Sequence, residues 1–403
     1  MYYIDETNAK KHVYPTYGRQ FDSYRWYKPI FTGALFAAIY MGLTLAGIMA
    51  LTTVAGAVTG DTTGTDTFNK MMEIVSGGYD TMDMSDPFQS VLQLGSLAIA
   101  IPSLWLATLI VRDRPMSSYS SSRGGWSHKV FWKCVPVAFI INGLPIIIND
   151  VIIEKGYQDF TVKFTVLSFI LLTILGPLQC IAEEYMFRGF VMQTFGSWFR
   201  IPVIAVILQA LIFAAGHPYN RIGQIAVAAS GAAFALSAWF GRGLEVSSAL
   251  HVVNNMTIFY LQGLGMTTVS SDTSVSGMLI DIGIAVVYVA VIFLLSKKTK
   301  WFDKVTKDDA ARVNARIAAK KAKKAAKKAA RAAKKAGTAV FEVVGDAGSA
   351  AADADAVSDR VANITEASPQ ASYDTAAAGD APEFDYTRST EGRSAEGGKH
   401  FKH

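Results

Sequence analysis

Long apolar runs separated by short polar stretches dominate the first three quarters of the chain. Many of these runs are long enough to cross a bilayer as a helix, which takes about 20 residues. The pattern therefore predicts an all-α fold, a polytopic membrane bundle of about eight transmembrane helices. The runs fall at about 31–58, 89–111, 130–153, 164–190, 201–218, 223–241, 246–264 and 275–296.

The composition supports this interpretation and excludes several classes of protein. Of the 403 residues, 51% are hydrophobic and 18% are charged, whereas about a quarter of a soluble globular domain is charged. The two cysteines, Cys134 and Cys180, lie in separate apolar runs, so neither a disulfide framework nor a cysteine zinc site is predicted. Residues 1–29 are polar and aromatic, which indicates an N-terminal segment without a cleaved signal peptide.

The distribution of charge among the loops predicts an orientation. Basic residues are frequent before the first apolar run and in the loop 112–129, whereas the loop 59–88 contains six acidic residues and one lysine. Cytoplasmic loops of membrane proteins carry the excess of Lys and Arg. We therefore expect a multi-pass protein of the cell membrane with both termini in the cytoplasm.

The chain changes character after the last apolar run. Residues 297–335 contain 16 Lys and Arg side chains against three acidic ones, and residues 336–403 contain five against 12. The run 312–335 consists almost wholly of Ala, Lys and Arg, which favour helix. We expect 297–336 to form a basic helical segment whose part 312–335 rests on anionic lipid headgroups, followed by a disordered acidic cytoplasmic tail at 337–403.

Nucleic acid is a less favoured partner for this basic segment. Proteins that bind single strands place aromatic side chains among the basic ones so that bases can stack on them. The run 312–335 contains no aromatic residue. The segment is therefore better suited to lipid headgroups than to bases.

Two carboxylates and a guanidinium lie near the end of the fourth apolar run, at about 164–190. Glu183, Glu184 and Arg188 follow the apolar residues of this run directly, and ionisable groups at membrane depth generally mark functional sites. On a helix, Glu184 and Arg188 are four residues apart and can pair. Glu183 is then left without a counter-charge. Polar residues on later apolar segments are its candidate partners: His217, His251 and Asn255.

This set of residues can support hydrolysis of an amide bond. The reaction needs a base to deprotonate water and donors to hold the oxyanion that forms. Glu183 is the candidate base, and His217 can share its water. His251 and Asn255 are four apart and can donate from one helical face. Each pair also has an ordinary structural interpretation as interhelical hydrogen bonding.

Three motifs occur in order on successive apolar segments. They are Glu-Glu-x-x-x-Arg (Glu183, Glu184, Arg188), Phe-x-x-x-His (Phe213, His217) and His-x-x-x-Asn (His251, Asn255). Together they resemble the motifs of the CAAX protease and bacteriocin-processing family of intramembrane endopeptidases, which includes the type II CAAX prenyl endopeptidases. The resemblance covers about 130–265, with the motifs in 180–256, inside an expected membrane domain at 30–296.

The resemblance implies a fold, an activity and a role for each motif residue. The substrate would be a membrane-associated or lipidated protein or peptide. Glu183 with His217 would activate water, His251 and Asn255 would form the oxyanion hole, and Glu184, Arg188 and Phe213 would support the site.

The sequence leaves two questions open: whether the site holds a metal, and whether the protein is an enzyme. The absence of a His-Glu-x-x-His motif favours a site with no cofactor, whereas a zinc ion would be held by His217, His251 and Glu183. A non-enzymatic membrane scaffold, or a bacteriocin self-immunity protein that binds a peptide in the same pocket, is the principal alternative. A transporter is less favoured because no internal repeat is found.

The predicted helix ends place His217 far from Glu183 along the membrane normal. With helices ending at 190 and beginning at 201, Glu183 lies towards the cytoplasmic end of its helix and His217 towards the opposite end. One solution is that the helix that begins at 201 tilts or starts later, with residues 191–200 forming part of the connection towards it. The other is that the site lies nearer to the middle of the membrane.

Overall fold

The computed structural model describes residues 13–61, 63–77, 82–268, 270–302, 314–315 and 318–332. In this part of the chain the regular structure is helical, and extended pairing is limited to isolated bridges, such as the one between Ser121 and Gly243. The chain divides into two units, Met1–Ala326 and Lys327–His403, and each is described by itself. The predicted all-α fold class is confirmed.

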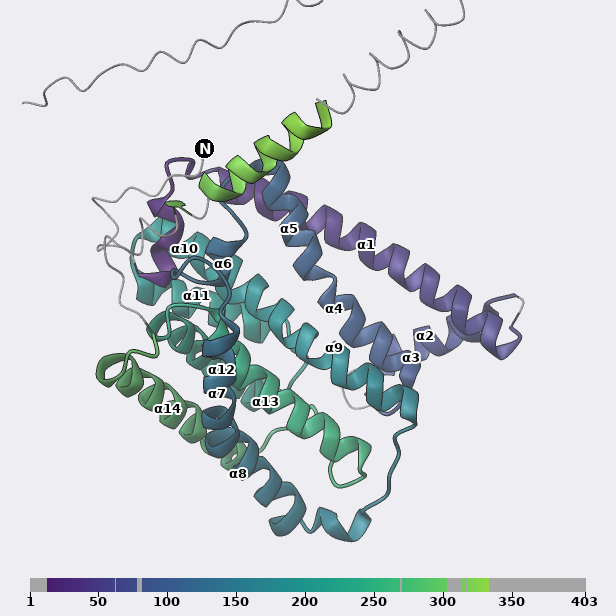
Figure 1. The fold of residues 1–403 in the computed structure, drawn as a ribbon. Coiled ribbons are helices and arrows are strands. Elements are labelled where there is room, and N and C mark those ends of the chain that lie inside the picture. Colours follow the sequence, from purple (N-terminus) through teal and green to yellow (C-terminus); the bar gives the residue numbers. More distant parts are fainter. Residues whose placement is uncertain are drawn as a thin grey trace, which may run out of the picture. The chain divides into compact units, whose positions relative to one another are not determined.

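Each predicted span corresponds to a helical segment (Figure 1). Among the described residues, six helical stretches are long and apolar enough to cross a membrane, and α11 is a shorter apolar helix. The protein is therefore a multi-pass membrane protein. The segments are α1 (Lys28–Thr59), Pro87–Val111, His128–Ile153, Val166–Phe199, α11 (Pro202–Ala215), α12 (Arg221–Phe240), α13 (Leu244–Gly263) and α14 (Val275–Lys298).

Three of these segments change their helical winding along their length. The second contains α3 (Pro87–Ser90), η3 (Val91–Gly95), α4 (Ser96–Ala98) and α5 (Ala100–Val111). The third contains α7 (His128–Ala138), η4 (Phe139–Gly143), α8 (Leu144–Ile147) and η5 (Ile148–Ile153), and the fourth contains α9 (Val166–Glu184), η7 (Tyr185–Val191) and α10 (Met192–Phe199). The elements η3, η4, η5 and η7 are π-helical, a winding that is often found at functional sites.

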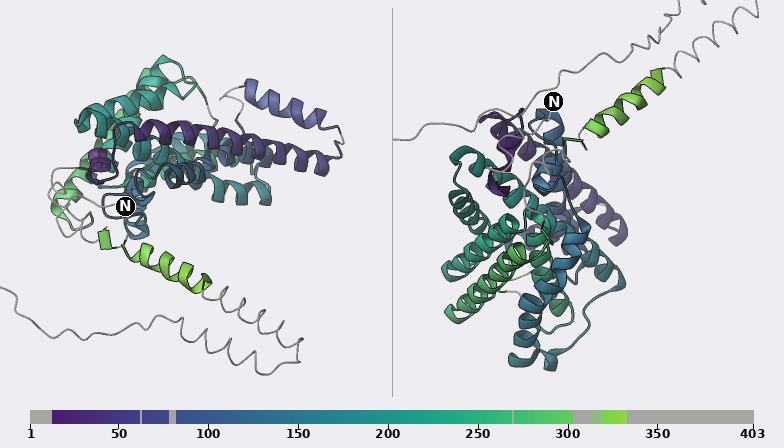
Figure 2. Two further views of the ribbon diagram at one scale, coloured as in Figure 1. Left: turned by 90° about the horizontal axis from the view of Figure 1, so that it is seen from above. Right: turned by 60° about the vertical axis from the view of Figure 1, so that its left-hand side comes forward.

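Helix α13 lies among other helices of the Met1–Ala326 unit (Figures 1 and 2). It packs against α7, α9 and α12, and 14 of its 20 residues are buried. Helix α1 packs along α5 at the edge of the bundle, and only three of its 32 residues are buried. Its exposed apolar side chains suit contact with lipid, whereas the polar residues of α13 are enclosed by protein.

Residues before α1 pack onto the bundle, which the sequence does not predict. The 3₁₀ helix η1 (Tyr14–Gln20) buries Tyr14 and Tyr17 and packs against α10. Gly196 of α10 permits this approach, because a Cβ atom there would overlap the Pro15 carbonyl group. Part of the expected 1–29 segment is therefore packed against the membrane domain.

Other helices lie outside the predicted spans. The loop between the first two spans contains α2 (Thr65–Gly77), and shorter turns form α6 (Ser117–Ser120) and η6 (Gly156–Asp159). In the basic segment, residues 314–315 and 318–332 are helical and almost all exposed, as expected from their alanine and lysine content. The acidic tail expected at 337–403 lies outside the described residues.

Candidate active site

The helix that carries Glu183 is longer than predicted. Helix α9 continues through the π-helical turns of η7 into α10 and ends at Phe199. Arg200 follows with a left-handed backbone (φ 63°), and Pro202 begins α11. The predicted end at 190 is therefore too early, and the turn between the two helices lies at 200–201.

This position of the turn brings Arg188 and Phe213 together across the hairpin. In an antiparallel hairpin, residues equally far from the turn lie opposite each other. The Arg188 guanidinium lies 4.2 Å from the centre of the Phe213 ring, which fits a hairpin centred at 200–201. His217 contacts the same Phe213 ring, with ring centres 4.5 Å apart. The longer helix thus brings His217 to the part of the hairpin that holds Arg188.

Glu184 and Arg188 form a buried ion pair. Arg188 Nη1 donates to Glu184 Oε1 at 2.9 Å, and both side chains are 0% exposed. Arg188 Nη2 donates to the Gly231 carbonyl group of α12 at 3.3 Å. The guanidinium also lies over the rings of Phe213 and Phe234, at 4.2 and 4.8 Å from their centres. The predicted pairing is present, and it joins α9 and η7 to α11 and α12.

His251 lies between the two carboxylates. Its Nδ1 is 3.0 Å from Glu184 Oε1, and its Nε2 is 3.6 Å from Glu183 Oε2. The imidazole stacks on Phe234, with ring centres 4.9 Å apart and an angle of 16° between the planes. Because Glu184 also binds Arg188, the guanidinium, carboxylate and imidazole fix one another. The Nε2 atom is therefore directed to the side of Glu183.

Glu183 is enclosed by protein, with 7% of its surface exposed. Its Oε1 accepts a hydrogen bond from Gln179 Nε2 at 2.7 Å, and Gln179 Oε1 accepts one from Asn255 Nδ2 at 3.5 Å. Asn255 is therefore connected to Glu183 through Gln179. The sequence reasoning missed Gln179, although an amide four residues before a glutamate lies on the same face of a helix.

His217 follows the end of α11 and reaches this group through Phe213. Its Nδ1 is 2.7 Å from the Phe213 carbonyl oxygen, and the two rings are 4.5 Å apart. The Phe213 ring in turn meets His251 edge to face at 6.4 Å. All seven predicted residues are thus connected. Asn255 is connected to Glu183 through Gln179, and His217 is connected to the others through Phe213.

The part of the chain that holds this cluster is similar to a known family. Residues 164–257 match the model of the family described as type II CAAX prenyl endopeptidase Rce1-like. These residues form an Rce1-like domain. The uncharacterized protein YyaK of Bacillus subtilis (strain 168) is 29% identical over 148 residues, which are 35% of this chain and 48% of that protein. The match thus spans about half the length of this relative, and no solved structure matches the chain significantly.

The Rce1-like domain contains all of the motif residues. It begins just before α9 and ends inside α13, so the glutamates, Arg188, both histidines, Phe213 and Asn255 all fall within it. The resemblance inferred from the three motifs is confirmed.

The set of residues predicted as the alternative zinc ligands is not brought together as a group of three in the described part of the chain. Within the described residues, no group of three or more His, Cys, Asp or Glu side chains is arranged to hold a metal. The predicted set of His217, His251 and Glu183 does not converge: His251 directs its two ring nitrogens to two different carboxylates, and His217 Nδ1 contacts the carbonyl group of Phe213.

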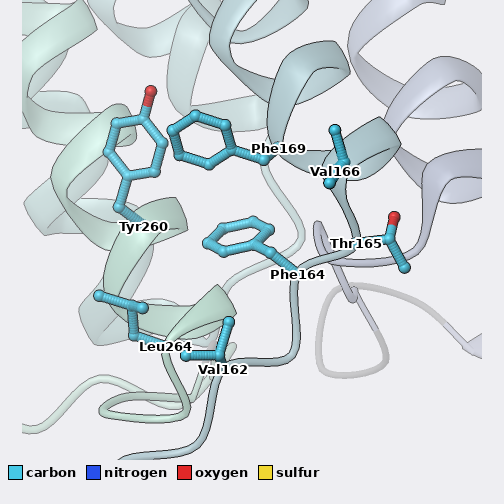
Figure 3. A pocket seen from close by; sticks show the side chains of 7 residues that line it. All are labelled: Val162, Phe164, Thr165, Val166, Phe169, Tyr260 and Leu264. Atoms are coloured by element: carbon cyan, nitrogen blue, oxygen red, sulfur yellow. The ribbon is translucent and has the colours of Figure 1, made fainter.

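A pocket of about 650 Å³ lies elsewhere in the molecule, between the start of α9 and the end of α13 (Figure 3). The Phe164, Phe169 and Tyr260 rings lie next to one another in its lining, with ring centres 5.8–6.3 Å apart. Phe169 precedes Glu183 by 14 residues on one helix, which is roughly 21 Å. The pocket is therefore separate from the ionisable cluster, and its lining offers mainly apolar contact. The lining residues are Val162, Phe164, Thr165, Val166, Phe169, Tyr260 and Leu264.

Proposed function

We propose that this protein is an intramembrane endopeptidase that hydrolyses peptide bonds of membrane-associated or lipidated proteins or peptides. The observation that carries the proposal is the position of Glu183, enclosed inside an Rce1-like domain with its Oε2 3.6 Å from His251 Nε2. A carboxylate and an imidazole held at this distance can act on the same small molecule. The enclosed position also explains how a charged residue is accommodated in an apolar helix.

Glu183 is the proposed general base. It takes a proton from a water molecule that His217 shares, and the resulting hydroxide oxygen bonds to the carbonyl carbon of the substrate. The C–N bond then breaks, and the amine leaves with the proton that Glu183 received. General base catalysis of this kind contributes a factor of about 10²–10⁴ to the rate.

His251 and Asn255 are the proposed donors to the oxyanion. When both nitrogens of His251 carry protons, Nδ1–H donates to Glu184 and Nε2–H is free to donate beside Glu183. Asn255 has a second amide N–H besides the one that Gln179 accepts. One such donor is worth about 10²–10³ in kcat. Glu184 and Arg188 act in this scheme by holding the His251 ring, and Phe213 packs against Arg188 and His251.

Metal dependence, location and lipid contact are part of the same proposal. The reaction requires no metal, because the carboxylate and the imidazoles supply the base and the donors. The protein lies in the cell membrane with both termini in the cytoplasm. Its basic segment at 312–335 binds anionic lipid headgroups.

The test is a comparison of newly formed peptide termini. Purified protein is incubated with membrane proteins of its source, and the new termini are labelled and identified by mass spectrometry. Wild type should produce termini that are lost, by a factor of about 10²–10⁴ in rate, in Glu183→Gln and in His217→Ala. Addition of a chelator should change nothing. Glu73→Gln, an exposed glutamate in α2, is the matched control and should cleave like wild type.

The result also separates the enzyme from its principal alternative. Equal patterns of termini from wild type and Glu183→Gln would reject the proposed mechanism. Retention of a peptide by both proteins without cleavage would then support a scaffold or immunity protein that uses the same cluster for binding.

A further inference from the structure

Four side-chain amides form a continuous hydrogen-bonded chain that ends at Glu183. Asn142 Nδ2 donates to Asn254 Oδ1 at 3.1 Å, and Asn254 Nδ2 donates to Asn255 Oδ1 at 3.1 Å. Asn255 Nδ2 donates to Gln179 Oε1 at 3.5 Å, and Gln179 Nε2 donates to Glu183 Oε1 at 2.7 Å. Every amide thus donates a hydrogen bond to the next group on the way to the carboxylate, and all except Asn142 also accept one from the amide before.

The chain crosses three helical segments of the membrane domain. Asn142 lies in η4, Asn254 in α13 and Gln179 in α9. Asn142 and Gln179 are 8% and 4% exposed. A buried amide without a partner costs about 1–3 kcal/mol, so these residues are maintained in an apolar bundle through their mutual bonds. Asn142 also lies outside the Rce1-like domain at 164–257, so the chain connects that domain to a neighbouring helix.

We propose that Asn142, Asn254 and Gln179 form, with Asn255, a positioning chain that holds Glu183 in its working orientation. The inference rests on the proposed function of Glu183 as the base. Gln179 occupies Oε1 of the carboxylate, and Oε2 is thereby turned to His251 Nε2, 3.6 Å away. Aligned hydrogen bonds polarise one another, so a change at Asn142 is felt at Glu183 although the two residues lie on different helices.

The positioning chain of amides predicts how two substitutions combine. Residues that act independently have additive effects, whereas members of one network do not. Gln179→Met and Asn142→Leu each remove the amide and keep a similar volume. Gln179→Met should lower kcat by roughly tenfold or more, the worth of a hydrogen bond to a charged group. Asn142→Leu should lower kcat by about two- to tenfold, the worth of a hydrogen bond between neutral groups, and neither variant should change KM much. The double variant should be no slower than the slower single variant.

Asn149→Leu is the matched control, because Asn149 lies on the same segment as Asn142 but is exposed and donates to Asp150. It should keep the kcat of wild type. Thermal unfolding in detergent identifies any variant that fails to fold, and Asn142→Ser replaces Asn142→Leu in that case. Additive losses of kcat in the double variant would overturn the proposal.

A second measurement needs no substrate. Dicyclohexylcarbodiimide is an apolar reagent that modifies carboxyl groups, and the hydrogen bond from Gln179 Nε2 shields Glu183 Oε1 from it. Labelling of Glu183, followed by mass spectrometry, should be several-fold faster in Gln179→Met and Asn142→Leu than in wild type or Asn149→Leu. Equal labelling rates would overturn the positioning chain. If wild type cleaves nothing, the proposed endopeptidase activity fails while the labelling still decides this inference.

Discussion

Replacement of Arg188 by methionine should destabilise the protein strongly. The guanidinium is 0% exposed, pairs with Glu184 at 2.9 Å and lies over the rings of Phe213 and Phe234. Removal of one partner of a buried ion pair costs about 3–5 kcal/mol, because the other charge is left buried and unpaired. The lost contact with the two rings adds about 0.5–2 kcal/mol. Methionine fills a similar space, so the loss of charge is the main effect.

The free energy of unfolding in mixed micelles measures this cost. Arg188→Met should lower it by at least about 3 kcal/mol. The double variant Arg188→Met with Glu184→Gln should recover a large part of the loss, because no unpaired charge remains. Arg200→Met is the matched control, since Arg200 is exposed at the end of α10, and should change stability by about 0.5 kcal/mol or less. A loss below about 1 kcal/mol in Arg188→Met, or no recovery in the double variant, would refute the reasoning.

Two further predictions concern groups outside the membrane-spanning helices. The backbone N–H of Thr67 is the main cause that lowers the pKa of Asp61 from 3.8 to about 2, so ionised Asp61 stabilises the fold above about pH 4 and this contribution is lost as the pH falls through 2. The Tm of wild type should therefore exceed that of Asp61→Asn at pH 6 and approach it at pH 2.5; a pH-independent difference would contradict the assignment. Replacement of the six lysines at 320, 321, 323, 324, 327 and 328 by glutamine should abolish salt-sensitive co-flotation of the protein, held in neutral nanodiscs, with phosphatidylserine vesicles, since each lysine near an anionic surface contributes about 1 kcal/mol. Unchanged co-flotation would exclude the lipid contact.

The order of the membrane helices could be predicted from the sequence because the bilayer imposes a length on apolar runs. The exact ends could not. The helix of Glu183 runs to Phe199 because residues 191–199 pack against η1 and α11, and this packing depends on segments far away in the chain. The place of η1 was missed for the same reason: Tyr14 and Tyr17 read as polar aromatic residues, and only the bundle shows what buries them.

The site was predictable to the extent that its chemistry is local. Glu184 and Arg188 are four residues apart, and any helix brings them together. The position of His251 between the two glutamates is a property of the crossing of α9 and α13. The same crossing connects Gln179 to Asn255. Spacing along one helix cannot supply such a contact, so Asn255 could be assigned from its motif, whereas Gln179, Asn142 and Asn254 remained unassigned in the sequence.

The hairpin between α10 and α11 makes the length of its arms more important than their composition. Glu184 and His217 are 33 positions apart, and the reversal of the chain lies midway between them. A single residue inserted in either arm would shift one partner along the axis by about 1.5 Å and rotate it by about 100°. The stretch from 189 to 212 thus serves as a spacer of fixed length. Outside buried positions such as Gly196, substitutions in it should be better tolerated than insertions or deletions.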